Sequence, residues 1–259
     1  MVRLPIAHRI ERPDVRSWGN QLYILDILDR IAADPVHDRY VVLDSDCVWP
    51  RPVGAMAQAI EAHGVLTLLL DDGSEAAPIN GCSGEGMAAY LRRVTGQGPD
   101  SLRYCGGEIF AATRAEILRI AGQIDAFWAP IAAGEPVEIR EEAHFLSCIY
   151  AANGYRLGTA NPFVRRIWTT LRVHDARPAD EALTVWHLPA EKRTGFRRLF
   201  RRLAREAASG RMGLDRLGLP LYREVMGLPR RRLGKTVRDL WAKLMQKAEG
   251  RWRAGARHA

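Results

Sequence analysis

The sequence predicts an α/β fold, in which a mostly parallel but mixed sheet is flanked by helices. Short apolar segments alternate with segments of helical periodicity through the first part of the chain. The 259 residues are 47% hydrophobic, which is enough to build one large domain or two small ones. We expect an α/β domain at residues 1–190 and a basic helical tail at residues 191–259.

Helix and strand alternate at the start of the predicted domain. Apolar residues at helical spacing predict a helix from Asn20 to Ala33, which Asp34 and Pro35 end. Three further elements follow, and they are an apolar strand at residues 40–43, a helix at 53–62 and a buried strand at 65–70. In a sheet of this kind, ligands bind beyond the carboxyl ends of the strands.

Two acidic segments lie further along the chain. Gly106 and Gly107 precede an apolar segment and predict a turn, or a substrate-facing loop, that carries Glu108. Glu141 and Glu142 open the next predicted helix. Acidic residues in a first helical turn complement the helix dipole, which is a purely structural role. A carboxylate above a cleft could instead act as a general base or bind a sugar hydroxyl, and the sequence leaves both readings open.

Charge is distributed unevenly along the chain. Residues 1–190 hold 18 Lys and Arg against 24 Asp and Glu, whereas residues 191–259 hold 20 against 6. Two stretches of this tail, 195–208 and 236–252, place apolar and basic side chains on opposite faces of a helix. Such helices bind anionic membrane surfaces, or else pack on the α/β domain with a solvated basic face. We favour the membrane for the first stretch, because five arginines accompany two phenylalanines there.

The composition argues against several other classes of protein. The four cysteines are far apart and form no Cys-x-x-Cys pair, which predicts reduced, mostly buried thiols. Pro5, His8 and Arg9 interrupt the segment where a signal peptide requires an unbroken apolar core. No run approaches the roughly 18 apolar residues that a membrane-spanning helix needs. We therefore expect a cytoplasmic protein, with any membrane contact peripheral and on the inner face.

The strongest chemical signal is a pair of aspartates directly after the strand at residues 40–43. Both carboxylates of Asp44 and Asp46 can reach one hard divalent cation, which would neutralise a diphosphate. His187, in a short extended segment, is a candidate third ligand, and Lys192 is placed to stabilise a departing phosphate. The alternative is a solvated strand end, because Asp is common where strands end and turns begin.

Taken in order, these segments resemble the nucleotide-sugar glycosyltransferases of the A-type fold, over about residues 18–200. In that superfamily, an Asp-x-Asp pair binds the manganese or magnesium ion that holds the donor diphosphate. The resemblance implies that Asp46 and His187 are metal ligands, and that Asp44 shares the metal or binds the donor ribose. It also implies that the donor sugar and the acceptor are lined by Gly106, Gly107, Glu108, Glu141 and Glu142. The implied reaction transfers a sugar from a nucleoside-diphosphate sugar, and the basic amphipathic tail suggests a lipid-linked or envelope acceptor.

The chain departs from the pattern of this superfamily in two places. Members with a late histidine usually carry His-x-x-Gly-x-x-Lys, whereas Ala190 stands at the glycine position here and Lys192 comes one residue early. Members also place strands before the Asp-x-Asp pair to hold the nucleotide base, but only 43 residues precede Asp44. The domain is therefore expected to be short at its N-terminus, with Asn20 and Gln21 facing the nucleotide instead.

Two other functions fit parts of the sequence. Asp44-x-Asp46 also matches the opening motif of haloacid-dehalogenase-like phosphohydrolases, in which the first Asp is a nucleophile and the second a general acid. The paired acids at Asp71 and Asp72 come too early for that enzyme. A non-enzymatic alternative assigns the function to the basic tail, as a module that binds membrane or RNA. Nucleic acid is the less favoured partner, because the aromatic residues lie on the apolar face rather than among the arginines.

Overall fold

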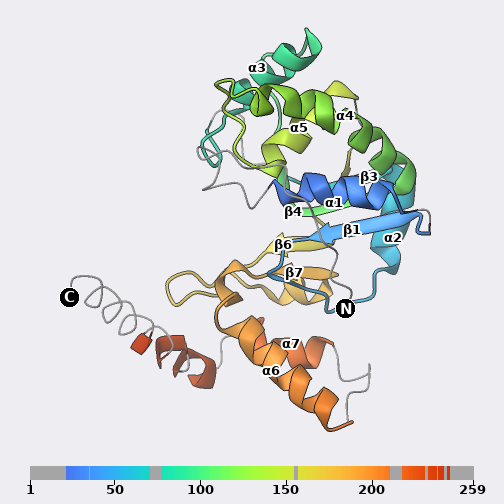
Figure 1. The fold of residues 1–259 in the computed structure, drawn as a ribbon. Helices are drawn as coiled ribbons and strands as arrows, with labels where there is room; N and C mark the ends of the chain where they lie inside the picture. The colour runs from blue at the N-terminus through green and yellow to red at the C-terminus, as the bar shows by residue number, and fades with distance from the viewer. Residues whose placement is uncertain are drawn as a thin grey trace, which may run out of the picture. The chain divides into compact units, whose positions relative to one another are not determined.

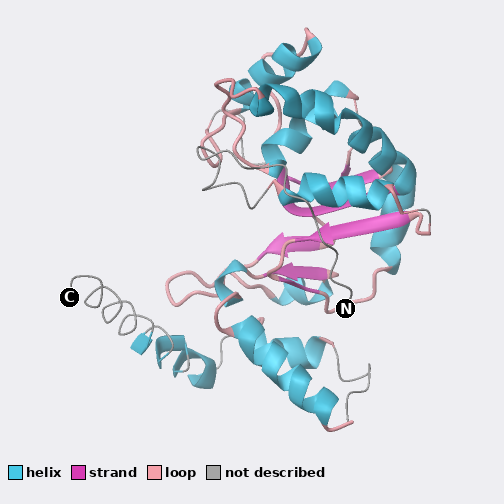
Figure 2. Ribbon diagram, viewed as in Figure 1, coloured by secondary structure: helices cyan, strands magenta, loops and turns pink. Residues whose placement is uncertain are grey.

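The computed structural model describes most of the chain, namely residues 22–34, 36–70, 77–154, 157–210, 218–230, 233–237, 239–241 and 244–245. The chain forms two compact units (Figure 1). The first comprises Met1–Leu43 and Gly54–Asn161, and the second comprises Asp44–Val53 and Pro162–Ala259. Each unit contains its own sheet with helices packed around it, so the α/β class is confirmed (Figure 2). The units do not divide at residue 190, where the change in charge placed the expected boundary.

The first unit is built on a mixed sheet. Its strands lie in the order β1 (Arg39–Leu43), β4 (Cys105–Thr113), β3 (Val65–Leu69) and β5 (Gly158–Thr159). β4 runs antiparallel to both of its neighbours, whereas β3 and β5 are parallel. β1 and β3 therefore point in the same direction on either side of β4. The sheet is mixed as expected, but its hydrogen-bonded neighbours are mainly antiparallel, because a late strand inserts between two early ones.

Helices cover both faces of this sheet. α1 (Tyr23–Ala32), α3 (Gly84–Thr95), α4 (Arg114–Ala132) and α5 (Glu142–Ala152) pack against one another on one face, and α2 (Gly54–His63) contacts β3 and β4 separately (Figure 1). Local signals explain both ends of α3. The Ser83 hydroxyl accepts a hydrogen bond from the Gly86 N–H at 3.0 Å and begins α3, and Gly96, with φ of 78°, ends it.

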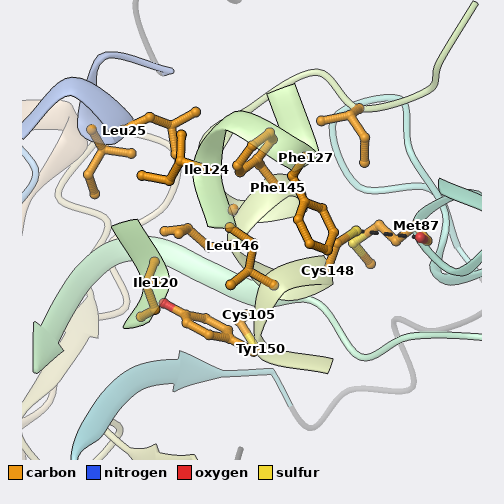
Figure 3. Close-up of a cluster of buried hydrophobic side chains, with 14 of the residues drawn as sticks. Leu25, Met87, Cys105, Ile120, Ile124, Phe127, Phe145, Leu146, Cys148 and Tyr150 are labelled. Carbon is orange, nitrogen blue, oxygen red and sulfur yellow. Dashed lines mark hydrogen bonds between the residues drawn. The ribbon is translucent and has the colours of Figure 1, made fainter. Parts of the chain in front are cut away.

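The core of the first unit follows from this arrangement. Side chains of β4 alternate, so Phe110 and Ala112 join the cluster made by α1, α3, α4 and α5, while Ile109 and Ala111 point to the other face. Figure 3 shows members of this cluster packed together, among them Phe127 and Phe145. The buried cysteines belong to the same core, and burial raises the pKa of Cys82 to about 12 and that of Cys105 to about 11. These thiols are therefore inert hydrophobic side chains at neutral pH.

The second unit contains a smaller sheet, in the order β2 (Cys47–Val48), β7 (Val185–His187) and β6 (Val164–Arg166). β2 pairs antiparallel and β6 parallel with the central strand β7. The Trp186 side chain on β7 is fully buried, and its Nε1–H donates to the Asp180 carbonyl at 2.6 Å. The elements around this sheet are η2 (Pro178–Ala182), η3 (Pro189–Glu191), α6 (Gly195–Ala208) and α7 (Leu219–Met226).

The first amphipathic stretch of the tail is α6, and part of its apolar face is buried within its own unit. Leu199 is 7% exposed and belongs to the hydrophobic core of the second unit, and Phe196 and Leu203 pack against that core. Phe200 is the exception, because 73% of its surface is exposed. In the part of the chain that the structure describes, no helix combines the length and the apolar content that crossing a bilayer requires.

Candidate metal centre

The second unit holds the aspartate pair in a fixed turn. The Cys47 N–H donates to the Asp44 carbonyl at 3.1 Å, and the Leu188 N–H donates to the Asp46 carbonyl at 2.8 Å. β2 begins at once, and its pairing with β7 sets Cys47 opposite His187. Because Asp46 directly precedes Cys47, this register brings the second aspartate beside the histidine. The third candidate ligand, far away in sequence, is thus placed by the pairing of two very short strands.

The three candidate ligands lie close together, Asp44 and Asp46 in this turn and His187 at the end of β7. His187 Nε2 lies 3.5 Å from Asp44 Oδ2 and 3.2 Å from Asp46 Oδ1. One ligand atom from each of the three residues lies within 4.8 Å of the other two. The side chains of Asp46 and His187 are 1% and 3% exposed, whereas that of Asp44 is 38% exposed. Two carboxylates and an imidazole, partly open on one side, form a suitable ligand set for a divalent cation such as manganese.

The charges around Asp46 also suit a cation. Burial alone would raise the pKa of Asp46, but His187 and Lys192 outweigh this effect and lower it overall, so the group is an ionised carboxylate. Lys192 Nζ lies 3.1 Å from Asp46 Oδ2. Asp46 Oδ1 is buried, and it accepts no hydrogen bond from the described residues despite its short distance to His187. A buried carboxylate oxygen without a hydrogen-bond donor is costly, and a bound cation would satisfy it. These residues therefore fit a metal ion.

A second group of acidic residues lies in the first unit. Glu141 is the N-cap residue of α5, but its side chain makes no capping hydrogen bond. Its carboxylate instead accepts hydrogen bonds from the Tyr104 hydroxyl at 2.6 Å and from Asn80 Nδ2 at 2.7 Å. Burial, followed by the Glu141 charge, raises the pKa of Tyr104. Tyr104 therefore stays a neutral donor, and Glu141 ties the start of α5 to the segment before β4.

Gly106 and Gly107 lie within β4, so the predicted turn or loop at this point is wrong. The β3–β4 pairing is irregular here, because Thr67 faces Phe110 while the next residue, Leu68, faces Gly106. Intervening residues of β4 therefore bulge out of the ladder. A Cβ on Gly106 would meet the Glu108 carboxylate, and one on Gly107 would meet that of Glu142. The glycines thus make room for two nearly buried carboxylates beside the strand.

His144 is a further buried polar residue near Glu141, and the sequence predicted no role for it. The Arg140 N–H donates to His144 Nδ1 at 3.2 Å, so Nε2 carries the proton and donates to the Ile79 carbonyl at 2.9 Å. Burial is the main cause that lowers the pKa of His144 and keeps the ring neutral. No pattern in the sequence indicates that Asn80 donates a hydrogen bond to Glu141. Tyr104 could have been found, because it lies two residues before the glycine pair in the sequence.

Tyr104→Phe is expected to lower the free energy of unfolding by about 1–3 kcal/mol, because the buried Glu141 carboxylate loses a hydrogen-bond donor. Chemical denaturation of the two proteins measures this difference. Tyr222→Phe is the matched control, because the Tyr222 hydroxyl makes no hydrogen bond to the described residues. Equal losses for the two variants would show that the Tyr104 hydroxyl contributes nothing specific.

The predicted site residues thus fall into two groups, one in each unit. The second unit gathers the candidate metal ligands together with Lys192. The first gathers the three glutamates and the glycine pair, and Asn20 and Gln21 lie outside the described residues. Comparison with protein-family models finds no match for the chain, and comparison with curated proteins finds no significant relative. The functional argument therefore depends on the geometry of these groups.

Proposed function

We propose that this chain is a metal-dependent glycosyltransferase that uses a nucleoside-diphosphate sugar as its donor. The observation that supports the proposal is the closeness of Asp44 and Asp46, in the turn before β2, to His187 at the end of β7. A manganese or magnesium ion bound there would supply positive charge to the diphosphate. An ionised, buried Asp46 next to a half-buried Asp44 suits that task, because one carboxylate is fixed and the other can adapt.

Each of the four residues around the candidate metal centre has a proposed role in binding the metal or the diphosphate. Asp46 is the principal ligand, because its carboxylate is buried and ionised. His187 is the third ligand, and Asp44 shares the metal or binds the donor ribose. The side chain of Lys192 is 56% exposed and ends beside Asp46, so it can reach a phosphate oxygen as negative charge grows on the leaving diphosphate.

The three buried glutamates of the first unit, Glu108, Glu141 and Glu142, remain candidates for contacts to the sugar or the acceptor, and one of them is a general base if the enzyme inverts configuration. Glu141 is the least suited, because Tyr104 and Asn80 already donate to its carboxylate. We therefore assign sugar or acceptor contacts to Glu108 and Glu142, beside the glycine pair. The proposed acceptor is lipid-linked or part of the cell envelope, and the proposed location is the cytoplasmic face of the membrane.

Thermal unfolding with a panel of uridine, guanosine and thymidine diphosphate sugars tests the proposal. One of these donors is expected to raise Tm in the presence of manganese, and a chelator is expected to abolish the rise. A ligand at a hundredfold excess over its Kd stabilises the folded state by about 2.7 kcal/mol, which is readily measured. A donor-induced rise that survives the chelator would contradict the metal role. Hydrolysis of simple phosphomonoesters without any donor binding would favour the phosphohydrolase instead.

A further inference from the structure

The last described helix has its polar side buried and its apolar side exposed. It comprises the helical residues 233–237, 239–241 and 244–245, and we call it the C-terminal helix. Lys235 and Asp239 are only 1% and 8% exposed. Its apolar side chains are between 46% and 86% exposed, and they are Leu233, Val237, Leu240, Trp241, Leu244 and Met245. Their spacing places most of them on one face, opposite Lys235 and Asp239.

Ion pairs within the second unit hold the polar face inward. Lys235 Nζ lies 2.7 Å from Glu191 Oε1 and 2.6 Å from Asp239 Oδ2. Asp239 Oδ1 in turn lies 3.2 Å from Arg198 Nη2 on α6. Rotating the helix to bury its apolar face would expose Lys235 and leave the fully buried Glu191 without its cation. Such a loss is expensive, so the ion pairs keep the apolar face directed outward.

This distribution is the reverse of that in an ordinary surface helix, which turns its apolar stripe toward the core. A contiguous exposed apolar face marks a site of interaction with another surface. The surrounding sequence indicates the charge of that surface, because residues 230–259 hold 10 Lys and Arg against 2 Asp and Glu. The partner is therefore both apolar and anionic. A second copy of the chain does not fit, because two such basic segments repel each other.

We propose that the apolar face of the C-terminal helix inserts into the surface of an anionic phospholipid bilayer. Trp241 suits this position, because its ring favours the boundary between headgroups and acyl chains. The neighbouring basic residues would meet the lipid phosphates and carboxylates. RNA fits less well, because the exposed face offers aliphatic side chains rather than arginines alternating with aromatic rings. This binding is independent of the proposed transferase reaction, since it involves no residue of the metal centre.

Cosedimentation of the full chain with lipid vesicles tests the proposal. We expect binding to vesicles of phosphatidylcholine and phosphatidylglycerol in equal parts, weak binding to pure phosphatidylcholine, and a decrease with added salt. A variant with Trp241→Ser and Leu244→Ser should bind the anionic vesicles about tenfold more weakly, or worse, because it loses two inserting side chains. Both residues are well exposed, so the variant is expected to keep the wild-type Tm.

Leu118→Ser is the matched control, because Leu118 is 43% exposed on α4 of the other unit and should not affect binding. Equal binding of the wild type and the double variant to anionic vesicles would overturn the proposal. A wild type that does not bind anionic vesicles would overturn it as well. RNA that displaces the lipid at physiological salt would also overturn it. So would light scattering that shows a dimer which the double variant abolishes. Metal-dependent donor binding is measured separately, so either proposal can fail without the other.

Discussion

Lys235→Met is expected to destabilise the second unit by about 3–5 kcal/mol, because it removes the cation from a buried ion cluster. Glu191 is 1% exposed, and without Lys235 the hydrogen bonds that its carboxylate keeps from described residues come from the Thr169 and Thr194 hydroxyls. Asp239 still has its ion pair with Arg198, so most of the lost stability comes from the unpaired charge of Glu191. Methionine preserves the length of the side chain, which separates the loss of charge from the loss of packing.

Hydrogen exchange followed by mass spectrometry localises this effect. Protection of peptides that contain β7 should fall, while protection of peptides that contain β4 in the first unit serves as an internal reference. Arg202→Met is the control for an exposed cation, and breaking its surface pairs with Glu206 and Glu224 should cost about 0–1 kcal/mol. Adding Glu191→Gln to Lys235→Met should restore part of the stability. If the double variant loses as much stability as the two single variants together, Lys235 and Glu191 are not coupled.

Local sequence patterns were sufficient to predict the helices and strands whose bounds follow from apolar periodicity. The expected strand at 65–70 and helix at 53–62 match β3 and α2 within a residue, because apolar periodicity follows the backbone geometry. The insertion of β4 between β1 and β3 could not be predicted in this way. That register sets Arg39 opposite Thr113, and no local pattern encodes such a pairing. α3 was missed because its apolar run is short, although Ser83 and Gly96 marked both of its ends.

The candidate site shows the same division between local and distant information. Asp44 and Asp46 are neighbours in sequence, so their convergence was predictable, whereas His187 joins them only through the pairing of β2 with β7. The glycine pair was misread because glycine indicates either a turn or a close approach, and only the packed structure shows the carboxylates beside β4. Lys235 looked like one more solvated basic residue, and its burial is a product of tertiary structure.

Asp46→Asn is expected to abolish the metal-dependent rise in Tm with the donor sugar nucleotide, and to lower turnover at least about a hundredfold. The amide has the shape of the carboxylate but lacks its charge, so the fold should persist while the cation loses its principal ligand. Asp180→Asn is the matched control, because Asp180 is a buried carboxylate of the same unit that pairs with Arg165 at 2.8 Å. We expect this control to lower Tm and still respond to manganese and donor.

Asp44→Asn separates the two enzymatic hypotheses. In the transferase, the half-exposed Asp44 assists a metal that Asp46 and His187 also hold, so this change should weaken turnover less than Asp46→Asn does. In a phosphohydrolase of the haloacid-dehalogenase type, Asp44 would be the nucleophile, and its replacement would remove all activity. Steady-state rates of both variants on the same donor and on a small phosphomonoester distinguish these outcomes. A larger effect at Asp44 than at Asp46, together with phosphatase turnover, would contradict the proposed transfer of a sugar.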